Sequence, residues 1–304
     1  MIYTLTLNPA LDYTMQVPVL RHDDINRSQG ESLAGGGKGV NVSILLTRLG
    51  IPNTALGFAG GFTGRQLAEQ LARQGVACDF TPIAGETRIN VKIASQTEWD
   101  FNARGPVVSQ TEWAALLARL DRLAPGDDLV LSGSAPAGLD ADAYAQILAR
   151  LAPRQVRCTV DAAGELLTRA LPYRPFLIKP NHHELGDLFG GLAQTDEQVA
   201  HYAARLQAMG ARNVLVSRGE KGALLLDETG ARHTVGVAPG KTVSTVGCGD
   251  SMVAGFLAGW NQTGDYAHAL RLGAACGCAT AYVQGLAGAK DVERVLAFFA
   301  PAQE

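Results

Sequence analysis

The stretch that decides the fold runs from residue 245 to residue 256 and reads TVGCGDSMVAGF. A glycine turn made by Gly247, Cys248 and Gly249 opens a run of small and apolar residues that is typical of a buried helix. Amides at such a turn converge at the positive end of the helix and form an anion site. Asp250 follows, and two interpretations stay open. Its carboxylate either caps the helix or takes a proton from a hydroxyl while the amides hold a phosphoryl group.

Glycine clusters of this kind recur along the chain, which has 35 glycines in 304 residues. They fall at residues 35–39, 57–64, 132–138, 219–222 and 247–249. Each cluster lies after a strand-like run or before a helix-like run, where a turn needs positive φ or a ligand needs close backbone approach.

Short apolar runs alternate with amphipathic helical patterns over most of the sequence. The expected strands include residues 2–7, 129–132, 158–161, 176–179 and 214–217, and the expected helices include 38–49, 64–74, 110–123, 140–151, 196–209 and 251–260. This alternation predicts an α/β fold in which helices cover both faces of a mostly parallel sheet. We expect one domain over residues 1–304, with its ligand site beyond the carboxyl ends of the strands.

Two stretches, residues 12–33 and 87–106, depart from this alternation. They lack the helical period and alternate polar with apolar residues, as in Arg88-Ile-Asn-Val-Lys-Ile. Irregular surface loops are one interpretation. We favour antiparallel strands that form a small extra sheet, because unstructured loops of this length are uncommon and often functional.

Charge and cysteine content exclude several classes of protein. Lys and Arg number 26 against 29 Asp and Glu, a net charge of −3, so a broad nucleic-acid-binding surface is not expected. No apolar stretch reaches the roughly 20 residues that span a bilayer, and the N-terminal residues do not resemble a secretory signal. Five cysteines without framework spacing suggest free thiols, and we expect a cytoplasmic protein.

A second glycine turn, Gly35-Gly36-Gly37-Lys38-Gly-Val-Asn41, leads into an expected helix. It is not a phosphate-binding loop of the Walker A type, because glycine follows the lysine where Ser or Thr would be needed. It also lacks the third glycine of a dinucleotide fingerprint. Lys38 and Asn41 lie about one helical turn apart and are expected to face the same ligand.

Polar residues also follow the expected strand at 176–179. Lys179, Asn181 and Glu184 come in quick succession. Asn181 and Glu184 fit a capping box at a helix start, and they also fit a magnesium or phosphate site built from oxygen ligands. The adjacent His182 and His183 diverge and do not suggest a metal pair.

Five ordered motifs together resemble the ribokinase-like (pfkB) carbohydrate kinases from the first strand to about residue 285. They are Asn8-Pro9-Ala10-x-Asp12, Gly36-Gly-Lys-Gly-Val-Asn41, Lys179-Pro-Asn181-x-x-Glu184, Ser217-x-Gly219-x-x-Gly222 and Val246-Gly-x-Gly-Asp250-Ser. The resemblance implies a three-layer α/β/α core with a mostly parallel central sheet and a small β-sheet lid, the two excursions above. Cys248 stands where the family usually has alanine.

The resemblance also implies roles for individual residues. Sugar-phosphate binding would fall to Asp12, Gly36, Gly37, Lys38, Asn41, Arg88, Asn90, Asn102 and Ser134. ATP binding would fall to Lys179, Asn181, Ser217, Gly219, Glu220, Gly222 and Gly249. Asn181 and Glu184 would help to place Mg²⁺, through water, while residues 247–249 hold the transferred phosphoryl group and Asp250 acts as the base.

Within the family, residues 87–92, 100–102 and 243–247 most resemble enzymes that phosphorylate fructose 1-phosphate at O6. Kinases of tagatose 6-phosphate or fructose 6-phosphate are the alternatives, since they share nearly every motif, and a non-catalytic phosphosugar-binding regulator is another. Lid strands with an exposed edge also suggest a homodimer that pairs through the lid.

Overall fold

The computed structural model describes residues 1–299, so the last five residues of the expected domain lie outside it. Its larger part is a nine-stranded sheet with the order β13-β12-β11-β10-β9-β8-β1-β4-β5. All neighbours from β11 to β5 in that order are parallel, and β12 and β13 add antiparallel at one edge. The strands are β1 (Ile2–Thr6), β4 (Asn53–Ala59), β5 (Ala77–Pro82), β8 (Asp128–Ser132), β9 (Arg157–Asp161), β10 (Leu177–Ile178), β11 (Asn213–Ser217), β12 (Ala223–Leu226) and β13 (Arg232–Val235).

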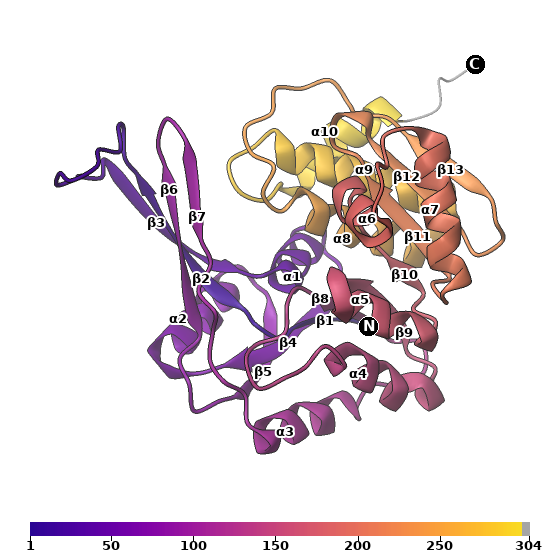
Figure 1. Ribbon diagram of the computed structural model, residues 1–304, viewed down its shortest axis with the longest axis horizontal. Helices are drawn as coiled ribbons and strands as arrows, with labels where there is room; N and C mark the ends of the chain where they lie inside the picture. The colour runs from indigo at the N-terminus through magenta and orange to yellow at the C-terminus, as the bar shows by residue number, and fades with distance from the viewer. Residues whose placement is uncertain (300–304) are drawn as a thin grey trace.

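Helices cover both faces of this sheet, which confirms the predicted three-layer α/β/α arrangement (Figure 1). One face carries α3 (Gln110–Leu120), α4 (Ala143–Leu151), α5 (Gly164–Ala170), α6 (His182–Phe189) and α7 (Asp196–Ala208). The other carries α1 (Lys38–Arg48), α2 (Gly61–Arg73), α8 (Cys248–Thr263), α9 (Tyr266–Ala281) and α10 (Ala289–Leu296). Each face of the sheet has its own hydrophobic core, and successive strand residues point to opposite cores. In β8, Leu129 and Leu131 pack against the first set of helices and Val130 packs against the second.

The predicted lid is present as a separate four-stranded sheet that projects from the body at the left of Figure 1. Its order is β3-β2-β6-β7, with β2 (Ala10–Gln16), β3 (Gly30–Gly36), β6 (Arg88–Ala94) and β7 (Glu98–Phe101). The expectation of antiparallel strands throughout is wrong, because β2 and β6 pair in parallel. Both leave the main sheet from the carboxyl ends of strands that run the same way, β1 and β5, so they enter the lid in one direction.

Some element boundaries differ from those expected. α2 begins at Gly61 rather than residue 64, and α8 begins at Cys248 rather than residue 251. Gly247 is the N-cap residue of α8 with φ +79°, so Gly249 and Asp250 already belong to the first helical turn. The expected strand at residues 176–179 is reduced to Leu177–Ile178.

Among residues 1–299, no helix combines the length and the apolar character needed to cross a membrane. All five cysteines are free, as the sequence suggested. The pair in α9, Cys276 and Cys278, takes no part in any cluster of metal-ligating side chains within the described part of the chain.

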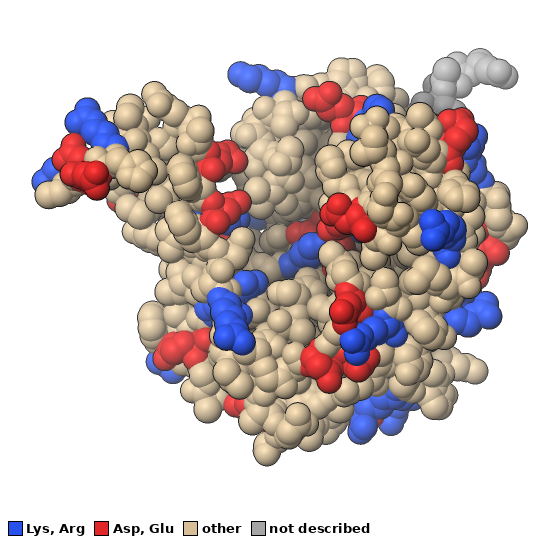
Figure 2. Space-filling model, viewed as in Figure 1, with Lys and Arg blue, Asp and Glu red and all other residues tan. Residues whose placement is uncertain are grey.

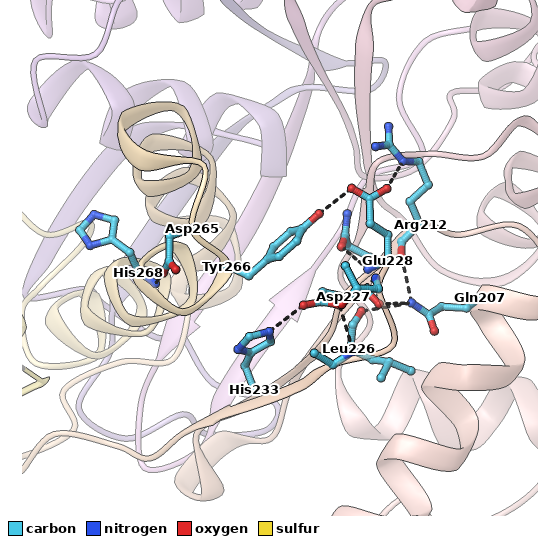
Figure 3. A network of polar contacts seen from close by, with 12 residues as sticks. Gln207, Arg212, Leu226, Asp227, Glu228, His233, Asp265, Tyr266 and His268 are labelled. Atoms are coloured by element: carbon cyan, nitrogen blue, oxygen red, sulfur yellow. Dashed lines mark hydrogen bonds and ion pairs between the residues drawn. The ribbon is translucent and has the colours of Figure 1, made fainter.

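Asp227 accepts several hydrogen bonds at the turn between β12 and β13, at one edge of the main sheet (Figure 3). Its Oδ1 accepts hydrogen bonds from Thr229 N, Thr229 Oγ1 and Ala231 N, and its Oδ2 lies 2.7 Å from His233 Nε2. Gln207 of α7 donates to the Asp227 carbonyl oxygen at 2.8 Å. Burial alone would raise the pKa of Asp227, but the hydrogen bonds from Thr229, His233 and Ala231 outweigh it and lower that pKa.

We expect Asp227→Asn to lower the free energy of unfolding by about 1–3 kcal/mol at pH 7, because the amide offers its donors no negative charge and replaces the oxygen that faces His233 with an NH₂ group. The contribution of Asp227 is present above its ordinary pKa and is lost as pH falls through the lowered value, so the difference from wild type shrinks in acid. Urea unfolding at several pH values measures it, with the exposed Glu69→Gln on α2 as control. Equal stability of Asp227→Asn and wild type at pH 7 would contradict this account.

Candidate active site

The predicted site residues gather where the carboxyl ends of the parallel strands meet the lid. In Figure 2 the surface between the lid and the C-terminal half is hollowed, and acidic and basic side chains lie together in the hollow. Two groups of contacts are built there. One joins α1, β9, the segment after β10 and α8, and the other lies at the root of the lid.

Asp161, the last residue of β9, lies at the centre of the first group and was not singled out from the sequence. Its side chain is 1% exposed, and its Oδ1 lies 3.0 Å from Lys38 Nζ and 3.5 Å from Lys179 Nζ. Burial alone would raise the pKa of Asp161, but the ammonium groups of Lys179 and Lys38 lower it. The sequence signal was a carboxylate that ends a buried strand, at the edge where ligands bind.

Lys38 is the first residue of α1, where a cation opposes the helix dipole. Burial alone would lower the pKa of Lys38, but the charge of Asp161 and the hydrogen bond to it outweigh burial and raise that pKa. Lys38 and Asn41 both reach carboxylates of this group, Lys38 that of Asp161 and Asn41 that of Asp250, and their contact with one ligand stays a prediction.

Asp250 is 7% exposed, and Asn41 Nδ2 donates to its Oδ2 at 2.8 Å. No side-chain hydrogen bond caps α8, so the interpretation of Asp250 as the helix cap is wrong. Burial and the nearby negative charge of Asp161 raise the pKa of Asp250 to about 6, against the opposing effects of Asn41, Lys179 and Lys38. A buried carboxylate with a pKa near neutrality and no structural partner on its own helix has the properties of a general base.

Two glycines at the start of α8 lie close to neighbouring side chains, and Gly247 also has φ +79°, which favours glycine. A Cβ at Gly247 would lie 2.6 Å from Leu286 Cδ2, and one at Gly249 would lie 3.0 Å from Lys179 Nζ. The positive end of α8 and the Lys179 ammonium therefore face the same space. Cys248 lies between the two glycines in the sequence, and burial raises the pKa of its thiol to about 11, so this side chain is neutral at physiological pH.

The second group joins three sugar-site candidates at the root of the lid. Asn90 Nδ2 donates to Asp12 Oδ1 at 2.9 Å, and Lys92 Nζ lies 2.9 Å from Asp12 Oδ2. Gly36 faces the same carboxylate, because a Cβ there would lie 2.6 Å from Asp12 Oδ1. Lys92 was not among the predicted site residues, although it ends the 87–92 stretch that the sequence singled out.

Arg88, at the start of β6, links the segment that leads into the lid with the segment that leaves it. Its Nε donates to the Asn8 carbonyl oxygen at 3.2 Å, and its Nη1 donates to the Ala103 carbonyl oxygen at 2.8 Å.

Gly37, the N-cap of α1, has φ +116°, and a Cβ there would lie 2.9 Å from Thr6 Cγ2. The backbone of α1 therefore begins in close contact with the end of β1.

Some of the predicted residues are not joined to either group. Asn102, Ser134 and Glu220 have exposed side chains, and within residues 1–299 no hydrogen bond or ion pair links them to the other candidates. Gly219 and Gly222 turn the chain between β11 and β12 with φ +58° and +76°. Ser217 ends β11 and pairs with Asn181 through a backbone bridge.

Asn181 and Glu184 form the capping box that was one of the two interpretations of this motif. Asn181 Oδ1 accepts from the amides of His183 and Glu184, and Glu184 Oε2 accepts from the Asn181 amide at 2.8 Å. No group of three His, Cys, Asp or Glu side chains in residues 1–299 could hold a metal directly. Asp161 Oδ2, however, is buried without a hydrogen-bond partner in the described chain. An orphaned carboxylate oxygen of this kind fits a hydrated cation.

The model of the pfkB family carbohydrate kinases matches residues 5–291, and the chain belongs to this family. It is 40% identical over 296 residues to a 1-phosphofructokinase of Bacillus subtilis, with 97% of each chain covered. It is 37% identical to a D-tagatose-1-phosphate kinase of Bacillus licheniformis, again with 97% of each covered. The family and these relatives show that the chain is a sugar-phosphate kinase.

Solved structures agree with this assignment. Phosphofructokinase-2 of Escherichia coli in complex with fructose-6-phosphate is 30% identical and superimposes with a TM-score of 0.91, covering 98% of both chains. The similarity extends over the lid as well as the main sheet, because almost the whole of each chain is included.

We expect Asp250→Ala to lower kcat by roughly 10²–10⁴, the usual contribution of a positioned base, with KM little changed. Steady-state ADP release measures this. The control is Asp265→Ala, which removes a carboxylate that does cap a helix, α9, and should cost stability but not kcat. If activity survives Asp250→Ala within a few-fold, Asp250 is not the base.

The pH dependence of kcat/KM should report Asp250 in the free enzyme. A base must be ionised, so kcat/KM is expected to fall as pH drops through about 6 and to reach a plateau above it. A profile that stays flat down to pH 5 would show that no group with this pKa is required.

Proposed function

We propose that this protein transfers the γ-phosphoryl group of ATP to O6 of D-fructose 1-phosphate and so forms fructose 1,6-bisphosphate and ADP. The observation that carries the proposal is the position of Asp250. Its carboxylate is buried, does not cap its own helix, and lies at the positive end of α8 near the ammonium group of Lys179. A base, an anion-binding helix end and a cation within one space are what phosphoryl transfer requires.

The acceptor sugar would lie between the lid and α1. Asp12 and Asn90 are held side by side in the lid and offer an acceptor and a donor for sugar hydroxyls. Lys38 and Lys92 also lie on this side, each paired with a carboxylate. Arg88 donates to backbone carbonyl oxygens and brings a positive charge that a neutral sugar would not need. Gly36, Gly37, Asn41, Asn102 and Ser134 complete the set that we assign to the sugar phosphate.

The nucleotide would lie on the other side of Asp161. We assign its binding to residues that follow β10, that end or follow β11, or that begin α8: Lys179, Asn181, Ser217, Gly219, Glu220, Gly222 and Gly249. Asp161 Oδ2, Asn181 and Glu184 would hold hydrated Mg²⁺. When bound, this cation would neutralise negative charge on the phosphates.

In the proposed reaction, Asp250 takes the proton of the 6-hydroxyl as the oxygen attacks the γ-phosphorus in line with the leaving ADP. Asn41 holds one oxygen of Asp250, which leaves the other for that proton. The amides of residues 247–249 and the ammonium group of Lys179 receive the charge that spreads over the transferred phosphoryl oxygens. Closure of the lid would exclude water from the site.

The names of similar proteins point to other sugar-phosphate substrates, which the assay below compares. The Bacillus licheniformis relative is named for D-tagatose 1-phosphate, and the Escherichia coli structure holds fructose-6-phosphate. A pure phosphosugar sensor would have no use for the buried base and the nucleotide turns together.

Free cysteines fit the cytoplasmic location that we also propose.

A coupled ADP-release assay with Mg-ATP compares kcat/KM for the candidate acceptors. We expect fructose 1-phosphate to exceed fructose 6-phosphate, tagatose 6-phosphate and free fructose by at least about 100-fold, because its phosphate meets the lid-side cations while O6 faces Asp250. Tagatose 1-phosphate is included as the stereochemical control. A 6-phosphate that wins would overturn the substrate assignment but keep the kinase class. Binding without turnover would favour a sensor.

We also propose a homodimer that pairs through the lid. The lid exposes several large apolar side chains, among them Leu33, Ile89, Trp99 and Phe101, and the last two stack at 6.4 Å between ring centroids. Apolar surface on a sheet with free edges favours association with a second copy.

Light scattering tests this assembly. The wild type is expected at twice the 32.0 kDa chain mass, and Phe101→Asp is expected to shift it toward the monomer. Phe62→Asp, at an exposed apolar residue of α2 outside the lid, is the control and should leave the mass unchanged. A monomeric wild type would contradict the proposal.

A further inference from the structure

Arg48, the last residue of α1, joins three segments that are far apart in the sequence. Its Nη1 donates to the carbonyl oxygens of Leu286 and, at 3.3 Å, Ala287, and its Nη2 donates to Gln74 Oε1 at 3.2 Å. Gln74 is the C-terminal cap of α2, and residues 286–287 belong to the loop before α10. One guanidinium therefore ties the ends of α1 and α2 to that loop.

The loop that Arg48 holds lies against the start of α8. A Cβ at Gly247 would lie 2.6 Å from Leu286 Cδ2, so the Leu286 side chain covers the turn that opens the helix. Leu286 also packs against the apolar cluster that includes Leu11 of β2, Val40 of α1 and Leu67 of α2. This side chain touches both the phosphoryl side of the site and the elements that carry the sugar side.

A second path leads from the same loop to the residue after Asp250. The Ala287 amide donates to Thr280 Oγ1 at 3.3 Å, and Thr280 Oγ1 lies 2.8 Å from Ser251 Oγ. Both hydroxyl-bearing residues are fully buried. Buried hydroxyls without water have few alternative partners, so a shift of the loop would be passed to the first turn of α8.

We propose that Arg48 is a positioning residue for phosphoryl transfer. By fixing residues 286–287 it holds Leu286 on Gly247 and, through Thr280 and Ser251, sets the first turn of α8 that carries Asp250 and the anion-binding amides. The proposal rests on the proposed function, since it assigns Arg48 a part in that reaction. Transfer depends on placement at the level of about 1 Å, and misplacement of this size costs about 10²-fold.

Arg48→Gln tests the proposal by splitting kcat from KM. We expect kcat with fructose 1-phosphate and ATP to fall about 10- to 100-fold while both KM values stay within about two-fold, because Arg48 does not act on the substrates themselves. Arg48→Lys should recover part of the loss, since an ammonium group still donates to one carbonyl. Arg73→Gln, which removes an exposed arginine of α2 paired with Glu69, is the matched control and should change nothing.

Hydrogen exchange gives a readout that does not depend on turnover. In Arg48→Gln the amides of residues 247–251 and 286–287 should exchange faster than in wild type, while those of the central strands keep their rates. If wild type does not phosphorylate fructose 1-phosphate but this exchange change is present, the substrate assignment fails and the positioning role stands.

Two results would overturn the proposal. One is an unchanged kcat with unchanged exchange at residues 247–251, and the other is a raised KM with an unchanged kcat. Arg48 is exposed, so its replacement opens no cavity. Should Arg48→Gln still fail to fold, Thr280→Val removes the hydroxyl link while keeping the side-chain shape, and it is judged by the same kcat, KM and exchange criteria.

Discussion

A buried carboxylate between two ammonium groups is the interaction on which the site depends. Asp161 draws Lys38 from α1 and Lys179 from the segment after β10 onto one oxygen. Removing Asp161 would leave the buried Lys179 ammonium group without its carboxylate, at a cost of about 3–5 kcal/mol, so the three elements are held in register. Burial, together with the same negative charge of Asp161, raises the pKa of Asp250 to about 6.

This arrangement lets Asp250 remain basic although it lies at an anion-binding helix end. The amides at the start of α8 attract an anion, which would also stabilise an ionised Asp250 and weaken it as a base. Burial and Asp161 oppose that effect. Asn41 fixes the carboxylate from α1, so the helix that carries Lys38 also orients the base.

Much of this was readable from the sequence, because the relevant signals are local. The α/β alternation, the glycine turns and the lid excursions follow from periodicity and backbone conformation, and Asp250, Lys38 and Asn41 stand at helix starts that those turns define. The family resemblance then supplied roles that no single motif could. The capping box at Asn181 and Glu184 was likewise visible as spacing alone.

What the sequence could not predict are the contacts between distant segments. Asp161 looks like any polar strand end until β9 is placed beside β10 and α1. Lys92 gains its meaning from the parallel pairing of β2 with β6, which opposes Thr14 to Lys92 and brings Asp12 next to Asn90. Arg48 lies 238 residues before the loop it holds, and nothing in its local pattern points there.

The measurement that tests the central claim most directly is the identity of the product formed from fructose 1-phosphate and Mg-ATP, read by ³¹P and ¹³C NMR. We predict one new phosphate ester at O6, with one ADP for each fructose 1,6-bisphosphate. ADP formed without a sugar bisphosphate, or a phosphate placed on another oxygen, would contradict the arrangement of Asp250 and the lid that is described here.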